Sequence, residues 1–181
     1  MEPWKPRKGL LRKRTVGTIF EPMERELLGN AAAELCNALI KRQRTAPKDA
    51  LEEMTGISSG HTEKPNHPGL ARLLPDFEAA DAEEFEGDNG MLRQIHEPEI
   101  ISEKLTHLRY IVDALGPDGS VNVTLDDDEV PRWLAALNDI RLYKAAEFID
   151  EDGCLPEAGG DRRFVEWLAV CQESLLEAWY S

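Results

Sequence analysis

The chain has 181 residues, of which 41% are hydrophobic and 31% are charged, and its formal net charge at pH 7 is −14. This apolar content excludes global disorder, no apolar run reaches the roughly 18 residues that a membrane-spanning helix needs, and the first residues lack the apolar stretch of a secretory signal. The composition therefore predicts a cytoplasmic protein with a hydrophobic core and no membrane contact.

The negative charge is unevenly distributed along the chain. The first 14 residues carry six cations and one acid, a net charge of +5, which leaves −19 for the remainder. We therefore divide the chain into a basic arm at 1–14 and a single helical domain at 15–181. The cations of the arm are candidate contacts to a DNA backbone, and they are Lys5, Arg7, Lys8, Arg12, Lys13 and Arg14. Two other interpretations of the arm stay open: ion pairing with the acidic body, or a tail that only increases solubility.

The first elements after the arm are a strand and a long helix. The β-branched residues at 15–20 predict a short strand. The sequence Glu21-Pro22 is typical of a helix start, because proline is tolerated where the first N–H groups have no helical acceptor. The cations at 41–44 suit the end of that helix.

The middle of the chain predicts irregular structure. A short helical piece is expected around 50–54, followed by a mobile loop near 56–69 that is rich in Gly, Ser, His and Pro. The apolar segment 70–75 should attach the end of this loop to the core. An acidic connector near 76–90 follows, and we interpret it as a solvated surface rather than a dedicated site.

The second half of the chain predicts a strand between two helices and then a last helix. Apolar residues recur every three or four positions from 97 to 115, and a Gly-Pro pair ends that helix. Alternation predicts a strand at 121–125, and three aspartates after it predict a helix start with its cap at Asp128. The last helix is expected from about 161 to 179.

The two predicted strands share one context, in which a strand is followed by an acidic cap and a helix. We expect these strands to pair beside a helical bundle, although a likeness this short can also arise by chance. The predicted fold class is therefore mostly α: a helical bundle with a small two-stranded β element and a basic N-terminal arm.

The sequence contains no motif for catalysis or for metal binding. The four histidines lack the spacing of metal ligands, and there is no phosphate-binding loop, dinucleotide fingerprint or nucleophile elbow. The three cysteines, at wide and irregular spacing, give neither a disulfide framework nor a zinc cluster. We therefore expect a protein that binds partners and is not an enzyme, without a metal or a cofactor.

Four segments, in this order, resemble an actinobacterial family. They are Leu70–Pro75, Val123–Asp126, Trp133–Leu142 and Trp167–Leu175. The family is the domain of unknown function DUF2017, whose AosR-like members are described as oxidation-sensing transcriptional regulators tied to cysteine and thiol supply. The resemblance extends from the first strand to the last helix, and it implies a redox-responsive regulator that binds DNA, the transcription machinery or both.

The resemblance implies sensing cysteines, but it does not match them residue by residue. The pair that we expect is Cys154 with Cys171, and Cys36 is the substitute partner. Cys154 lies in an acidic loop and should be accessible. From the residues alone, a buried structural cysteine is the default interpretation of both Cys36 and Cys171.

Three polar residues interrupt the middle of an amphipathic helix: Asn138, Asp139 and Arg141. A charge in a core must be paired. We therefore interpret them as a buried hydrogen-bond network or a dimer contact rather than as catalytic groups.

The expected partners follow from the arm, the amphipathic helices and the acidic body. The leading hypothesis is a homodimer that contacts DNA through its basic arm. The alternative is an acidic adaptor that binds a sigma factor or RNA polymerase without contacting DNA directly.

Overall fold

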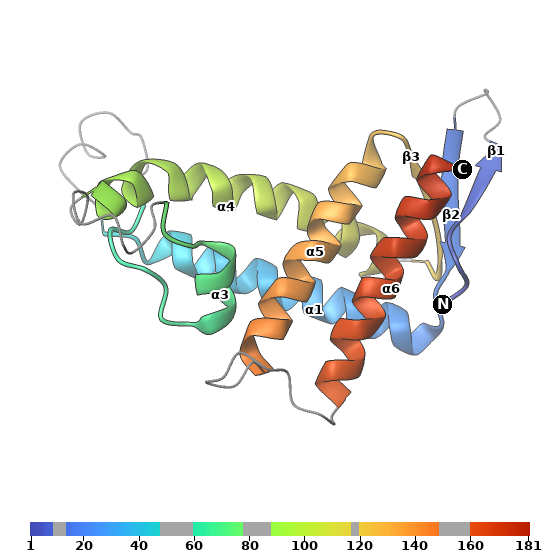
Figure 1. Cartoon of the computed structure of the whole chain (residues 1–181), viewed down its shortest axis with the longest axis horizontal. Helices are drawn as coiled ribbons and strands as arrows, with labels where there is room; N and C mark the ends of the chain where they lie inside the picture. The colour runs from blue at the N-terminus through green and yellow to red at the C-terminus, as the bar shows by residue number, and fades with distance from the viewer. Residues whose placement is uncertain (9–13, 48–59, 78–87, 117–119, 149–159) are drawn as a thin grey trace.

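The structure, a computed structural model, describes residues 1–8, 14–47, 60–77, 88–116, 120–148 and 160–181. Within these ranges the chain forms five helices and a small three-stranded sheet (Figure 1), which confirms the mostly α class. The helices are α1 (Pro22–Arg44), α3 (Pro68–Leu73), α4 (Asp88–Leu115), α5 (Glu129–Phe148) and α6 (Gly160–Tyr180). The strands are β1 (Lys5–Lys8), β2 (Arg14–Ile19) and β3 (Asn122–Asp126).

The helices pack as two crossed pairs. Helices α1 and α4 lie side by side along the long axis of the molecule, and α5 and α6 pack on each other across them (Figure 1). Helix α3 packs on α5, while the sheet closes one end of the molecule, where both chain termini lie (Figure 1). One core cluster draws on all of these elements, with Trp133, Leu137 and Ile140 of α5 almost fully buried in it.

The sheet confirms the predicted strand pairing and adds a strand. Strands β2 and β3 pair antiparallel, with Val16 opposite Leu125, and β1 pairs antiparallel on the other side of β2. The predicted two-stranded element is therefore three-stranded. Strand β1 was not predicted because it contains Pro6 and proline is rare in strands. Proline is tolerated in an edge strand, where one side of the backbone needs no partner.

Acidic side chains cap the helices that follow β2 and β3, as the shared context of the two strands predicted. The Glu21 N–H donates to the carboxylate of Glu24 at 2.9 Å within a capping box at the start of α1. At the start of α5 the Asp126 N–H donates to Glu129 at 3.0 Å, and the Asp126 carboxylate accepts from the Glu129 N–H at 3.1 Å. The cap predicted at Asp128 is therefore provided by Asp126, because the reciprocal partner is three residues after Asp126.

Helix α4 begins at Asp88, upstream of the predicted start at 97. Pro98 thus lies inside the helix, where a proline leaves one carbonyl without its helical donor. Here that carbonyl belongs to Gln94, and the N–H of Gly60 donates to it at 2.7 Å. The approach is so close that a Cβ at Gly60 would lie 2.9 Å from the Arg93 carbonyl oxygen. The N–H of Gly60, from a distant segment, thus replaces the helical hydrogen bond that Pro98 cannot donate to the Gln94 carbonyl.

The apolar segment at 70–75 attaches the preceding loop to the core, as predicted, because Leu70, Leu73 and Leu74 are buried. The predictions for 50–54, for 56–59 of the mobile loop and for most of the acidic connector concern residues outside the described ranges. Among the helices that the structure describes, none combines the length and the apolar content that crossing a membrane requires.

Candidate functional site

The outer face of the sheet carries cations of the predicted arm. Side chains alternate between the two faces of a strand, so Lys5 and Arg7 project on the face that Gly17 and Thr124 also occupy. Arg7 Nη1 donates to Thr124 Oγ1 at 3.1 Å. The guanidinium reaches across β2 because position 17 has no side chain; a Cβ there would lie 2.5 Å from Arg7 Nε. Gly17 thereby fixes Arg7 flat on the sheet.

The described cations of the sheet are not neutralised by the acidic body. Lys5 and Arg7 lie on the outer face, whereas alternation places Arg14 on the face of Val16. Lys5, Arg7 and Arg14 are exposed, and within the described ranges none of them forms an ion pair with a carboxylate. Asp126 lies at the end of β3 opposite Thr15, but its carboxylate caps α5. Of the other predicted DNA contacts, Lys8 ends β1, while Arg12 and Lys13 lie outside the described residues.

Residues 1–8 are packed on the body of the protein. Trp4 is buried, with its ring edge-on to Phe20 and Trp133 at centroid distances of 6.2 and 5.8 Å. Its backbone N–H donates to Ser174 Oγ at 2.9 Å, and the Glu2 N–H donates to the Ile19 carbonyl at 2.8 Å. Trp4 therefore anchors the segment that carries the basic strand.

Cys171 lies inside α6 beneath this N-terminal segment. Its side chain is 1% exposed, and its Sγ lies 3.4 Å from Met1 Sδ. Burial, together with the nearby negative charge of Glu24, raises the pKa of the Cys171 thiol to about 12. The thiol is therefore protonated and unreactive while this packing holds.

The other two cysteines are placed differently. Cys36 is half-buried on α1, and burial raises the pKa of its thiol. Cys36 and Cys171 are both free thiols in the structure. Cys154 lies outside the described residues, so its pairing with Cys171 stays a prediction.

The three polar residues of α5 form two separate contacts. Asp139 is buried and accepts a hydrogen bond from Lys104 Nζ of α4 at 2.8 Å. Burial raises the pKa of the Asp139 carboxyl, although the Lys104 ammonium opposes this change. Arg141 Nη2 donates to Asn138 Oδ1 at 3.1 Å, while the buried Arg141 Nε has no partner in the part of the chain that the structure describes.

A buried ionic cluster was missed by sequence reasoning. Arg93 Nη1 donates to Glu97 Oε2 at 3.0 Å, and Arg42 Nε of α1 donates to Glu97 Oε1 at 2.8 Å. The same Arg93 guanidinium donates to the Leu74 carbonyl at 3.0 Å and to Asp76 Oδ1 at 2.7 Å. This hydrogen bond from Arg93 lowers the pKa of the Asp76 carboxyl. The available signal was the i,i+4 spacing of Arg93 and Glu97, but the helix was predicted to begin at 97.

We interpret this cluster as a structural contact between helices. It connects α1, the end of α3 and α4, and its charges are mutually paired. Within the described ranges, no group of three or more histidine, cysteine, aspartate and glutamate side chains could hold a metal ion.

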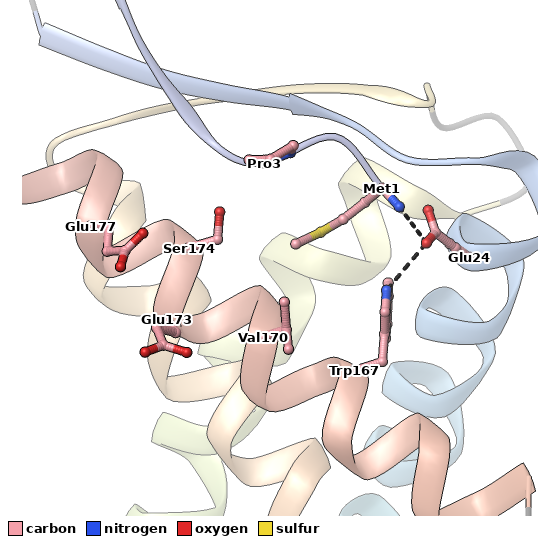
Figure 2. Close-up of a pocket in the computed structure, with 8 residues that line it drawn as sticks. All are labelled: Met1, Pro3, Glu24, Trp167, Val170, Glu173, Ser174 and Glu177. Atoms are coloured by element: carbon pink, nitrogen blue, oxygen red, sulfur yellow. Dashed lines mark hydrogen bonds and ion pairs between the residues drawn. The ribbon is translucent and has the colours of Figure 1, made fainter.

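A groove of about 470 Å³, also missed by sequence reasoning, runs between α6, the first turn of α1 and the N-terminal segment (Figure 2). Trp167 Nε1 of α6 donates to the Glu24 carboxylate at 3.2 Å, and the Met1 ammonium pairs with the same carboxylate. Figure 2 shows Val170 in the middle of the groove, with Glu173 and Glu177 at the end opposite Trp167.

Comparison with known proteins places these features in a family. Residues 1–179 match the family model described as "Domain of unknown function (DUF2017)". Proteins of Mycobacterium tuberculosis and Mycobacterium bovis named "Oxidative stress regulator AosR" are 38% identical to the chain over 130 residues, which are 67% of this chain and 59% of theirs. The chain thus matches less than two thirds of the length of these relatives.

A Mycobacterium leprae protein whose name also carries AosR is 32% identical over 177 residues, which are 89% of this chain and 81% of that protein. No solved structure matches the chain.

Proposed function

The chain belongs to the DUF2017 family, and from this membership we propose that it is a redox-responsive transcriptional regulator of oxidative-stress and thiol or cysteine homeostasis, which binds DNA through the outer face of its sheet. The proposal places it in the cytoplasm and includes no catalytic step. Its support from relatives is the name "Oxidative stress regulator AosR", borne by proteins 38% identical to it.

The observation that carries DNA binding is the exposed and unneutralised charge of the sheet. Lys5, Arg7 and Arg14 have no carboxylate partner within the described ranges. A phosphate backbone gains affinity from such cations by releasing its condensed counterions. Because Arg7 is already held by Thr124, part of the entropy cost of ordering it is met before DNA arrives.

The proposed redox response is supported by the position of Cys171. Its sulfur touches Met1 at the start of the segment that continues into β1. An oxidised sulfur is larger and more polar than a thiol, and it would not fit this packed contact. Because the packed thiol is unreactive, an oxidant would act on a form in which the N-terminal segment is displaced. Oxidation of Cys171 would then keep this segment, and with it the basic strand, from packing back.

A gel-shift titration on the DNA upstream of the neighbouring genes tests the proposal, with reduced and oxidised protein at two salt concentrations. The test variant is the triple change Lys5→Gln, Arg7→Gln and Arg14→Gln. We expect weaker binding, and a slope of log affinity against log salt that is smaller by about 2.7, because each lost phosphate contact removes about 0.9.

The matched control removes three cations elsewhere on the surface, through Arg44→Gln, Arg72→Gln and Arg109→Gln. Both variants change the net charge equally, so only a local effect separates them. Equal binding by the two variants would reject the sheet face as the contact. The absence of any specific shift in either redox state would reject direct DNA binding.

The second candidate function is an acidic adaptor that binds a sigma factor or RNA polymerase. It is favoured by the carboxylates of Glu173 and Glu177, which have no ion-pair partner among the described residues. Homodimerisation through the amphipathic helices remains part of the leading proposal, and sedimentation of the full chain measures it.

A further inference from the structure

We propose that the groove along α6 is the docking site for a basic, amphipathic helix of a partner protein. The inference rests on the adaptor function proposed above and is independent of the sheet face. The shape of the groove, the exposed apolar side chains along it and the sign of its charge all favour such a helix.

The groove continues into a second hollow. A depression of about 220 Å³ is lined by Leu27, Arg163 and Phe164 and shares Glu24 and Trp167 with the larger groove. The two hollows follow α6 from Phe164 to Glu177, a distance of about 20 Å at 1.5 Å per residue. This length accommodates a helix of roughly 13 residues.

The floor of the two hollows is apolar and exposed to solvent. Val170 is 57% exposed and Leu27 is 51% exposed. The Phe164 and Trp167 rings stack between them at a centroid distance of 5.8 Å. Amphipathic helices recognised in grooves place residues at i, i+3 or i+4 and i+7 on such a floor.

The rim of the larger groove is acidic, and the Met1 ammonium that lines it is already paired with Glu24. Glu173 and Glu177 are exposed and lie four residues apart on α6, so their carboxylates stand one helical turn apart. Cations at i and i+4 of a partner helix have the same spacing. By contrast, Glu166 on the same helix is already paired with Arg162 at 2.8 Å. Charge complementarity therefore selects a basic partner and repels an acidic one.

The probe is a fluorescein-labelled synthetic helix of 14 residues, with leucines along one face and lysine or arginine at its flanks. A scrambled peptide of the same composition lacks the apolar face. Anisotropy titrations of the full chain measure both affinities at two salt concentrations. We expect the amphipathic peptide to bind and the scrambled one to bind much more weakly, because only the former can bury apolar side chains in the groove.

Three variants at exposed positions separate the contribution of charge from that of apolar contact. The double change Glu173→Lys and Glu177→Lys should weaken peptide binding about tenfold or more, whereas Glu99→Lys on α4, exposed and outside the groove, should leave it nearly unchanged. The change Val170→Glu adds a negative charge to the groove but removes apolar floor. We expect it to weaken binding, and stronger binding would show that the contact is electrostatic only.

Several results would overturn the proposal. These are no binding of the amphipathic peptide, equal binding of the scrambled peptide, and equal effects of the double change and Glu99→Lys. If the wild-type chain sediments as a dimer that Val170→Glu dissociates, the occupant is a second copy and not a partner helix.

Circular dichroism verifies that each variant is folded. The gel shift on the same variants keeps the two hypotheses apart, because the groove substitutions should leave DNA binding intact.

Discussion

At the scale of single residues, the protonation of Cys171 is a measurable property. Burial raises the pKa of this thiol from 9.0 to about 12, and a thiol reacts through its thiolate. The thiolate fraction at pH 7 is therefore lower by roughly 1000-fold than in an ordinary cysteine. We expect the native chain to be alkylated by iodoacetamide at Cys171 about 1000-fold more slowly than a free cysteine, with a rate that rises about tenfold for each pH unit up to the pKa.

Mass spectrometry of the labelled peptides resolves each cysteine separately. In urea-unfolded protein the three cysteines should react alike, because burial no longer distinguishes them. Labelling of native Cys171 as fast as a free thiol would mean that the N-terminal segment opens readily. Slow labelling instead requires that an oxidant act on an open form, which makes displacement of that segment a precondition of sensing at Cys171.

At the scale of elements, α4 contains two ion pairs with the same i,i+4 spacing, of which one is buried and the other exposed to solvent. The side chains of Arg93 and Glu97 are each 2% exposed, whereas those of Arg109 and Asp113 are 80% and 68% exposed. Removing one partner of a buried pair leaves an uncompensated charge, so Glu97→Ala should lower the free energy of unfolding by about 3–5 kcal/mol. A double-mutant cycle on Arg93 and Glu97 should give a coupling energy of about 1–3 kcal/mol.

The exposed pair on the same helix is the control for this cycle. Arg109→Ala and Asp113→Ala should couple by less than about 0.5 kcal/mol, because water screens the charges. Urea unfolding monitored by tryptophan fluorescence measures both cycles. Additive effects at Arg93 and Glu97 would contradict the ionic contact.

The same elements show what the sequence could and could not predict. The bounds of α1, the start of α5 and the extent of α6 were predicted from Glu21-Pro22, terminal charges, the aspartates after β3 and helical apolar spacing, because these are local signals. The start of α4 was not predicted, since Gly60 compensates for Pro98 from a distant part of the chain. Strand β1 was missed because Pro6 disfavours a strand, and because the contact of the preceding Trp4 with Trp133 of α5 is also long-range.

The same distinction between local signals and long-range contacts applies to the candidate site. The cations of the N-terminal segment were found from charge alone, because clustered charge is visible in a sequence. The placement of Lys5 and Arg7 on one face of a sheet was not predicted, because it depends on the pairing of β1 with β2. The groove was invisible for a related reason: its wall and floor come from both ends of the chain, with Glu24 from α1 and Trp167 from α6.

At the scale of the whole molecule, the side chains of Trp4 and Met1 join the basic segment to the hydrophobic core. Trp4 belongs to the same core cluster as residues of α1, α4, α5 and α6. The segment therefore contributes to stability as well as charge. Deleting residues 1–8 would remove both contributions together, so loss of DNA binding by such a protein would not identify its cause.

Point substitutions separate the two contributions. We expect Trp4→Ala to lower the free energy of unfolding by about 3–5 kcal/mol, because it removes a large buried ring and leaves a cavity beside Phe20 and Trp133. The triple change Lys5→Gln, Arg7→Gln and Arg14→Gln alters exposed positions, each of which should change stability by no more than about 0.5 kcal/mol.

Urea unfolding compares the two variants with the wild type and with the deletion of residues 1–8. An unfolding midpoint of the deleted protein equal to that of the wild type would show that the segment does not pack on the core. If instead the deletion and Trp4→Ala destabilise the fold alike, a defect in DNA binding can be assigned to charge only in the triple variant, which keeps the core intact.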